Sequence, residues 1–169
     1  MRKMNRRTVM AGAVAAGAAG VMARAAEPET PGIAFAFEAY VTIGAAETPG
    51  PTPFGGRNRI PITGGHFEGP AIKGKVLPGG ADWQLVRSDG AVTLEADYMI
   101  QADDGTLIHV HNHAVVSGKP GTPDYYLRCA PVFEAPIGKH DWLNKALFVG
   151  TVTVEPKGDA VRVRVYKVT

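Results

Sequence analysis

The sequence predicts an all-β fold: a single, mainly antiparallel closed barrel of about eight strands with one short helical turn. Its 169 residues suffice for one domain with a substantial core. From residue 33 onward, short runs of alternating apolar and polar residues follow one another, with connections too short for crossover helices. Glycine pairs punctuate residues 55–83, as expected where strands bend sharply. A β-sandwich is the competing architecture, but the glycine pairs favour a barrel, which removes its sheet edges by closing.

The first 26 residues predict a cleaved twin-arginine signal peptide. They contain five basic residues and no acid, and the pair Arg6-Arg7 precedes a weakly hydrophobic run rich in Ala and Gly. Ala23-Arg24-Ala25 supplies a small-x-small cleavage site. A transmembrane anchor is the alternative, but the run is short for the ~20 apolar residues that a span needs. We therefore expect export to the periplasm or the extracellular space, a linker at 27–32 and one barrel domain at 33–169.

Without its leader the chain is mildly acidic. Removing the five basic residues of the leader leaves 13 Lys and Arg against 16 Asp and Glu, whereas the whole chain carries +2. No basic stripe interleaved with aromatic residues remains, which argues against a nucleic-acid partner, and no membrane partner is expected after cleavage. Cys129 is the only cysteine, so it cannot form a disulfide within the chain, and a buried apolar role is favoured over a nucleophilic one.

The individual elements follow from periodicity and turn residues. Residues 33–43 alternate cleanly and predict the first strand. Residues 45–56 contain three prolines and three glycines, so we expect a loop across one end of the sheet. Further strands are predicted at 57–63, 66–77, 82–87, 91–101, 106–116, 124–133, 147–155 and 160–168, and a helical turn at 140–145. The turns include Ser88-Asp89-Gly90 and Asp103-Asp104-Gly105.

Several spaced motifs resemble one known family. They are Thr52-Pro53-Phe54-Gly55-Gly56-Arg57, Ile62-Thr63-Gly64-Gly65-His66-Phe67-Glu68-Gly69-Pro70, Gly74-Lys75-Val76-Leu77-Pro78-Gly79-Gly80-Ala81-Asp82-Trp83, Asp103-Asp104-Gly105 and Trp142-Leu143-Asn144. Together they resemble, in order from about Phe35 to Val168, the family of domain of unknown function 3237. The resemblance implies a small closed barrel similar in outline to the allene oxide cyclase and dirigent barrels. It implies no particular reaction.

Candidate site residues gather in the glycine-rich half of the chain. An acid buried beside the indole of Trp83 would have a raised pKa and could move protons near neutrality, which makes Asp82 the candidate general acid or base. Arg57 could hold a carboxylate, an enolate or a phenolate by paired hydrogen bonds. The predicted catalytic residues are Asp82, Arg57 and Tyr126, and the predicted substrate-binding residues are His66, Glu68, Trp83 and Tyr98. Structural roles are the alternative: Asp82 could cap the Gly79-Gly80 turn or pair with Arg57, and Trp83 could fill the core.

A second candidate site is a row of histidines at 108–113, where related sequences carry a mixed polar strand. The i, i+2, i+4 spacing places His109, His111 and His113 on one face of a strand. Two of them with an acid from a neighbouring strand could bind zinc or another divalent ion. The outer two lie about 13 Å apart at ~3.3 Å per residue, too far for one ion without a bulge. A polar row facing solvent or the lumen is the favoured interpretation, and no metal is expected.

These residues predict a cofactor-independent lyase, isomerase or cyclase that acts on a small apolar, aromatic or carbonyl compound. The chain has no Gly-x-x-x-x-Gly-Lys, no dinucleotide fingerprint, no Gly-x-Ser-x-Gly and no paired cysteines, so no cofactor is expected. The alternative is a non-catalytic protein that binds a hydrophobic small molecule as lipocalins do. A solid barrel that serves a partner through its exterior is a third possibility, and strands with two part-apolar faces, such as 160–168, allow homo-oligomers.

Overall fold

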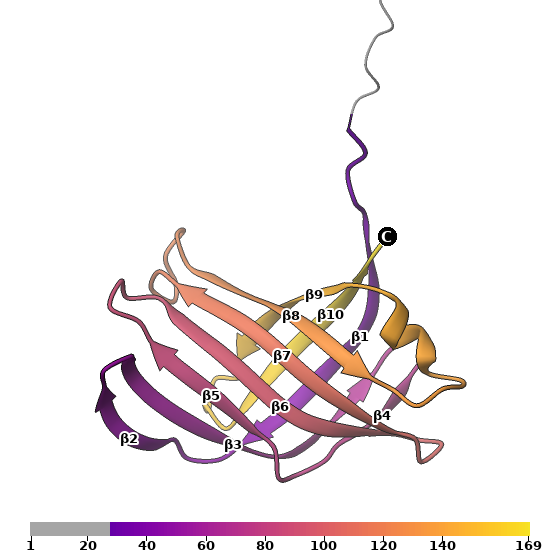
Figure 1. The fold of residues 1–169 in the computed structure, drawn as a ribbon, viewed down its shortest axis with the longest axis horizontal. Coiled ribbons are helices and arrows are strands. Elements are labelled where there is room, and N and C mark those ends of the chain that lie inside the picture. Colours follow the sequence, from indigo (N-terminus) through magenta and orange to yellow (C-terminus); the bar gives the residue numbers. More distant parts are fainter. Residues whose placement is uncertain (1–27) are drawn as a thin grey trace, which may run out of the picture. The chain divides into compact units, whose positions relative to one another are not determined.

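Ten strands and one 3-10 turn make up the fold in the computed structural model, which describes residues 28–169 (Figure 1). The strands are β1 Ile33–Ile43, β2 Glu47–Thr52, β3 Gly55–Glu68, β4 Lys73–Val76, β5 Ala81–Val86, β6 Val92–Ala102, β7 Leu107–Ser117, β8 Tyr126–Glu134, β9 Phe148–Val154 and β10 Ala160–Val168; the turn is η1 Asp141–Lys145. The predicted signal peptide lies outside the described residues. No helix among residues 28–169 has the length and apolar character that a membrane crossing requires.

The strands close into the predicted barrel. Neighbours follow the order β1-β10-β9-β8-β7-β6-β4-β3, and β1 also pairs with β3, which closes the ring. All pairings are antiparallel. Strands β4 and β5 occupy one position, because each pairs with a different half of β3 and of β6. The closed ring therefore has eight strand positions, which confirms the predicted fold class and strand number, and β2 lies outside it.

Three predicted elements were wrong. The strand predicted at 66–77 is interrupted, because β3 ends at Glu68 and β4 begins at Lys73. Residues 45–56, predicted as a loop, include the edge strand β2, which pairs only with β3. An edge strand tolerates Pro49 and Pro51 because one of its sides needs no backbone donors. The predicted break at Gly64-Gly65 is absent: β3 runs through it, and the register against β1 shifts between Thr42 and Ile43. Both glycines have positive φ, +142° and +136°, so β3 turns a corner there without ending.

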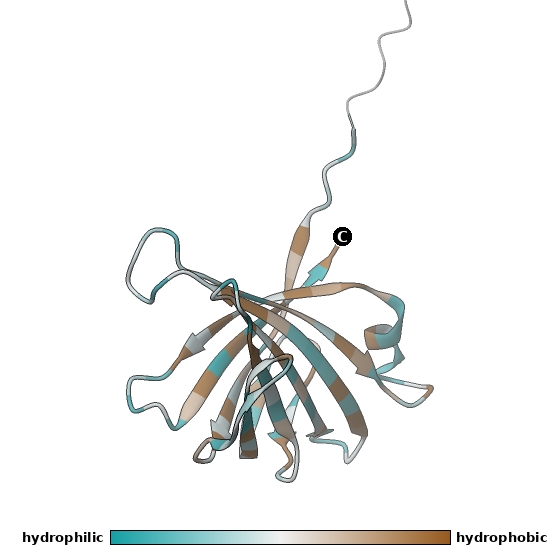
Figure 2. Ribbon diagram, turned by 60° about the vertical axis from the view of Figure 1, so that its left-hand side comes forward, coloured by the Kyte–Doolittle hydropathy of each residue, from teal (hydrophilic) through white to brown (hydrophobic). Residues whose placement is uncertain are grey.

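Side chains inside the barrel pack tightly at one end and leave space at the other. Hydrophobic and hydrophilic residues alternate along the strands, as Figure 2 shows. Near η1 and the turn at 103–106 the interior is filled by buried side chains, among them Phe67, Ile100, Ile108, Leu143 and Phe148. Phe133 contributes edge-on aromatic contacts to this cluster. The filled end makes the barrel a cup that is closed at its base.

The Asp-Asp-Gly turn is held by the carboxylate of Asp104, for which the sequence predicts only a place in the turn. Asp104 Oδ1 accepts a hydrogen bond from the Thr106 backbone N–H at 3.1 Å. Its Oδ2 lies 2.9 Å from Lys139 Nζ and 2.9 Å from Nε2 of His140, which is buried. The hydrogen bond from Lys139, followed by those from Thr106 and His140, holds the pKa of Asp104 well below its usual range. Asp104 thus ties the β6–β7 turn to the segment before η1.

We expect Asp104→Asn to lower the melting temperature at pH 7 and to matter less in acid. A carboxyl with a depressed pKa in the folded state stabilises the fold fully above its unfolded pKa of about 3.9, and this contribution is lost as the pH falls through the folded value. Thermal unfolding of both proteins between pH 7 and pH 3 measures the gap, which should narrow as the pH falls. Asp103→Asn is the control, because Asp103 is exposed and its ion pair with Lys73 is longer, at 3.6 Å. Equal effects of the two substitutions would contradict the prediction.

Candidate active site in the barrel lumen

A cavity of about 370 Å³ occupies the half of the barrel that the core leaves unfilled. Its volume lies within the range of small-molecule sites. Most of its walls are apolar, with Val, Ile, Leu and Ala from β1, β3, β6, β7, β9 and β10; the polar residues that line it are Asp82, Gln84, Tyr98, Asn112 and Tyr125. Val154 lines the cavity and is 53% exposed, so this end is open to solvent. The cup therefore has its mouth opposite the filled base.

Asp82 is the carboxyl group of this cavity. It points inward from β5, and Gln84, two residues further on the same face, donates a hydrogen bond from Nε2 to Asp82 Oδ2 at 2.8 Å. Asp82 Oδ1 is buried and has no hydrogen-bond partner among the described residues. Burial raises the pKa of Asp82, and the nearby charge of Glu95 adds to the effect, while the Gln84 hydrogen bond opposes it. Such a carboxyl can hold a proton at a pH where an exposed aspartate cannot.

Two further titratable groups, Tyr98 and Cys129, are buried in the barrel. Tyr98 on β6 is buried, and burial raises the pKa of its phenol, so it stays protonated. Burial also raises the pKa of the Cys129 thiol to about 11, against a hydrogen bond from Asn112 that lowers it. Cys129 is therefore a buried, protonated thiol, in line with the apolar role expected for it.

Arg57 and Trp83 lie on the outside of the barrel and do not join Asp82. Side chains alternate along β5, so the residue after an inward Asp82 points outward, and the Trp83 indole is 46% exposed with the Arg59 guanidinium 5.9 Å from its ring centre. Arg57 pairs in register with Leu85, which shares the outer face with Trp83. Trp83 thus neither fills the core nor desolvates Asp82; the apolar lumen does so.

The remaining predicted residues divide in the same way. Tyr98 faces the lumen as expected. His66 stacks on Tyr40 on the outer face, with ring centres 5.4 Å apart, and Glu68 lines the same outer groove. Tyr126 is 48% exposed beneath the Arg128 guanidinium, whereas its neighbour Tyr125 lines the cavity. Of the seven predicted site residues, the structure brings only Asp82 and Tyr98 together in the lumen.

Sequence reasoning missed Gln84, Asn112 and Tyr125, although a signal existed for two of them. Gln84 is two residues from Asp82, and residues i and i+2 of a strand share a face. Asn112 interrupts the apolar face formed by Ile108, Val110, Ala114 and Val116, and a polar residue at an interior position is the informative exception to burial. Nothing in the local sequence distinguishes Tyr125 from Tyr126.

The position of Arg57 leads to a prediction for its removal. Since its side chain lies on the outer face, we expect Arg57→Gln to leave turnover of a substrate nearly unchanged. Steady-state kinetics of the variant beside the wild type would measure this, with circular dichroism to verify that the fold is intact. A loss of turnover as large as that of an Asp82 variant would instead require Arg57 to reach the lumen.

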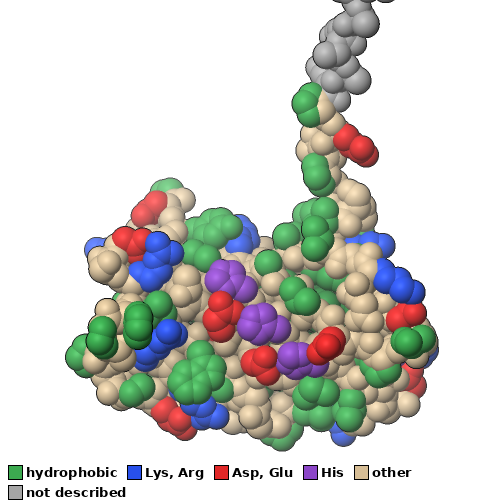
Figure 3. Space-filling model, in the orientation of Figure 1, with side chains coloured by type: hydrophobic (Ala, Val, Ile, Leu, Met, Phe, Trp, Pro, Cys, Tyr) green, Lys and Arg blue, Asp and Glu red, His purple; other side chains and the backbone are tan. Residues whose placement is uncertain are grey.

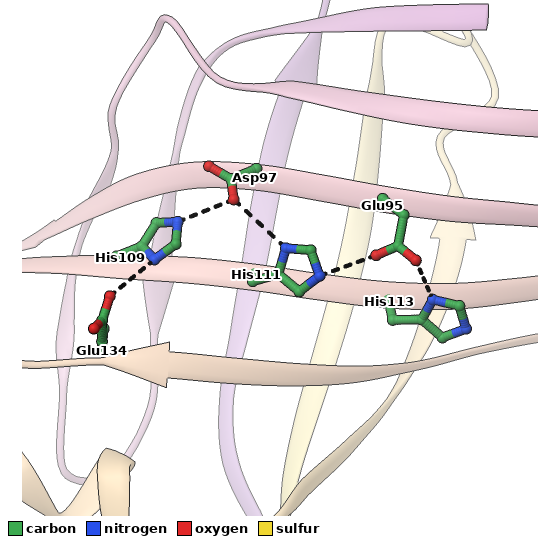
Figure 4. A network of polar contacts seen from close by, with 6 residues as sticks. All are labelled: Glu95, Asp97, His109, His111, His113 and Glu134. Atoms are coloured by element: carbon green, nitrogen blue, oxygen red, sulfur yellow. Dashed lines mark hydrogen bonds and ion pairs between the residues drawn. The ribbon is translucent and has the colours of Figure 1, made fainter. Parts of the chain in front are cut away.

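The three histidines form a polar row on the outer face of β7. Figure 3 shows them alternating with acids on one side of the molecule, and Figure 4 shows the contacts. His109 Nε2 lies 3.1 Å from Asp97 Oδ2, and its Nδ1 lies 3.4 Å from Glu134 Oε2. His111 lies between Glu95 and Asp97, at 3.0 and 3.5 Å, and His113 Nδ1 is 2.6 Å from Glu95 Oε1. The hydrogen bond from His109, with a weaker one from His111, lowers the pKa of Asp97.

This arrangement gives the metal alternative no support. Within residues 28–169 no group of three His, Cys, Asp or Glu side chains is placed to hold one ion. Each imidazole contacts carboxylates on adjacent strands, and neighbouring imidazoles share one: His109 and His111 share Asp97, and His111 and His113 share Glu95. Its solvent-facing position matches the favoured interpretation of these histidines.

Comparison with known proteins gives one family. The model of the family described as "Protein of unknown function (DUF3237)" matches residues 31–168. A UPF0311 protein of Rhodopseudomonas palustris is 35% identical over 129 residues, which cover 69% of this chain and 84% of that protein. The crystal structure of a conserved protein of unknown function from the same species aligns with a TM-score of 0.78 at 33% identity, covering 84% of this chain and all of that one.

One similar protein has a named activity. A hydroalkoxylation enzyme of Penicillium herquei is 30% identical over 131 residues, covering 78% of this chain and 80% of the enzyme. The crystal structure of an enzyme from Penicillium herquei aligns with a TM-score of 0.69 at 25% identity, covering 85% of this chain and 98% of that one. The barrel of this chain thus resembles one that carries out catalysis.

Proposed function

Since this chain belongs to the DUF3237 family, we propose that it is an exported, cofactor-independent lyase, isomerase or cyclase that acts on a small apolar compound, aromatic or carbonyl-containing, held in the barrel lumen. The observation that carries the proposal is Asp82: a buried carboxyl with a raised pKa and an unpartnered oxygen in an otherwise apolar cavity. Perturbed acids in clefts are typical of sites that move protons. The export that the leader predicts belongs to the same proposal.

Asp82 can supply the whole of the proton chemistry. In its protonated form it gives its carboxyl proton to an alkene carbon or a carbonyl oxygen of the substrate. The resulting carboxylate then accepts a proton from another atom of the same substrate, which restores the acid. Bonds shift or a ring closes while the numbers of protons and electrons stay constant, so the cycle needs no oxidant, reductant or cofactor. Gln84 holds Oδ2 of this carboxyl group by a hydrogen bond and so orients it.

The named activity of the Penicillium herquei relative fits this scheme. Hydroalkoxylation adds an O–H group across a carbon–carbon double bond: the carbon gains a proton and the oxygen loses one. One carboxyl group can mediate both transfers. We therefore include this addition, within one molecule, and its reverse elimination among the reactions proposed for this chain.

Binding without catalysis is the second candidate, and one observation favours it. Arg57 does not face the cavity, and none of the described residues that line it is cationic, so none of them could stabilise a developing anion by its charge; the cavity walls are mainly apolar. A protein that only stores a hydrophobic small molecule needs no more than such a cavity.

A turnover screen separates the two functions. The protein is incubated with a mixed panel of phenolic, enone and keto-acid compounds, and each compound is followed by mass-resolved chromatography. Loss of one compound with gain of an isomeric or fragment product supports the enzyme. Retention of an unchanged compound through gel filtration, with no product, supports the binding protein.

A further inference from the structure

The lumen contains a second polar group without a partner, which the chemistry of Asp82 does not use. Asn112 on β7 is only 7% exposed, lines the cavity, and its Oδ1 has no hydrogen-bond partner among the described residues. The amide group of Asn112 lies beside the Cys129 thiol, and a hydrogen bond from it lowers the pKa of that thiol. An unpaired buried acceptor destabilises a fold unless a bound molecule satisfies it. Asn112 Oδ1 is therefore an acceptor that none of the described residues uses.

The sheet register sets Asn112 and Asp82 at the two ends of one row. Asp82 on β5 is directly opposite Ala96 on β6, and Ala96 is directly opposite Asn112 on β7. All three residues line the cavity. Adjacent strands lie about 4.8 Å apart, so the two polar residues stand roughly 10 Å apart at their backbones. The methyl group of Ala96 between them leaves room for a flat apolar body.

Each residue of this row would contact a different chemical group of a ligand. Asn112 Oδ1 can only accept a hydrogen bond, so the ligand must offer it a donor. Ala96 offers an apolar surface, and Asp82 offers its acid proton. We propose that Asn112 is the specificity residue of the lumen and selects hydroxyl-bearing aromatic compounds, whose hydroxyl donates to Oδ1 while the ring lies over Ala96 and the reacting atom meets Asp82.

This inference rests on the proposed function for the role of Asp82, yet it makes a separate claim about recognition. A site with a buried acceptor rejects an analogue that lacks the donor, because the acceptor then stays unpaired after water is excluded. A methyl ether has the same ring and the same oxygen as a phenol but has no O–H to give. Comparing the affinity for a phenol with the affinity for its methyl ether therefore tests whether the site needs a hydroxyl donor.

Fluorescence titration of the full chain with 2-naphthol and with 2-methoxynaphthalene tests the proposal. We expect the wild type to bind 2-naphthol about 5- to 100-fold more tightly than its ether. Asn112→Leu, which keeps the approximate shape of the side chain, should reduce this preference at least fivefold, because it weakens the binding of 2-naphthol and not the binding of the ether. It should melt no lower than the wild type, because it removes an unpaired acceptor from an apolar wall; a structural asparagine would give the opposite result.

Two variants test the rival partners of the hydroxyl. Asp82→Asn and Tyr125→Phe alter the other polar groups that a phenol could reach, and both should keep the preference. If either variant abolishes it while Asn112→Leu retains it, the proposal is overturned, as it is if the wild type shows no preference or binds neither probe. If Asn112→Leu does not fold, Asn112→Ala replaces it with the same expected outcomes.

Different results would refute the proposed function and the role of Asn112. If turnover of every substrate survives Asp82→Asn, or no substrate is found, the enzyme proposal fails while the loss of hydroxyl preference in Asn112→Leu still stands. If Asp82→Asn abolishes turnover but Asn112→Leu leaves the preference intact, the enzyme proposal stands and the role of Asn112 falls.

Discussion

Asp82→Asn is expected to lower turnover by about 10²- to 10⁴-fold, the usual contribution of a general acid or base. The amide keeps the size of the side chain but cannot give or take the proton that the proposed reaction moves. Steady-state kinetics on a substrate found in the screen would measure the effect. Asp97→Asn is the control, because Asp97 lies on the outer face of the neighbouring strand and should leave turnover unchanged.

The stability of Asp82→Asn should change in the opposite direction to its activity. Burial raises the pKa of Asp82, so the ionised form is disfavoured in the folded state. The wild type therefore loses stability as the pH rises from the ordinary aspartate pKa of about 3.9 through the raised folded value. The uncharged variant has no such loss, and its free energy of unfolding at pH 8 should equal or exceed that of the wild type. If stability and turnover fall together, Asp82 is a structural residue.

Gly65→Ala adds a single methyl group, yet it is expected to lower the free energy of unfolding more than any other substitution proposed for this barrel. A Cβ on Gly65 would lie 2.0 Å from the Tyr40 carbonyl oxygen on β1, and the φ of +136° is one that alanine rarely adopts. Backbone strain alone costs about 1–3 kcal/mol, and the clash with a backbone atom that cannot move adds to it. A loss of more than about 4 kcal/mol, or failure to fold, is expected in urea unfolding.

Gly64→Ala is the matched control. Gly64 also has positive φ, +142°, but the nearest atom to its added Cβ would be the Val76 carbonyl oxygen at 3.7 Å, an ordinary contact. Only the strain of about 1–3 kcal/mol should appear. Equal losses at the two positions would mean that backbone conformation alone, and not the approach of β1, makes glycine necessary at this corner.

Much of the fold could be predicted from the sequence because strand periodicity is local. The bounds of β1 and β10 match the predicted ranges 33–43 and 160–168, because apolar and polar residues alternate along most of each strand. The edge strand β2 could not be found in this way, because its pairing depends on the presence of β3 and not on its own proline-rich residues. The Gly64-Gly65 corner likewise looks like a break in the sequence, while the ladders to β1, β4 and β5 keep β3 continuous.

The site could be predicted only in part, since alternation defines two faces without saying which one looks inward. The sequence predicts Asp82 and Trp83 in one site, yet adjacent residues of a strand face opposite ways: Asp82 lines the cavity, and Trp83 is exposed. The sequence also predicts Tyr126 as a catalytic residue, but Tyr126 is exposed and it is Tyr125 that lines the cavity. On the inward face of β7, Asn112 is a polar residue among apolar ones and could have been noticed in the sequence. The three histidines on the outer face of the same strand drew the prediction instead.

The filled base of the barrel has a kinetic consequence. Because Phe67, Leu143 and Phe148 occupy that end, a molecule that reaches Asp82 through the described barrel must leave by the way it came in. Product and incoming substrate then compete for the same form of the protein, so inhibition by product should be competitive. A cavity with one entrance that holds one molecule at a time suits the rearrangement of a single substrate better than the joining of two substrates.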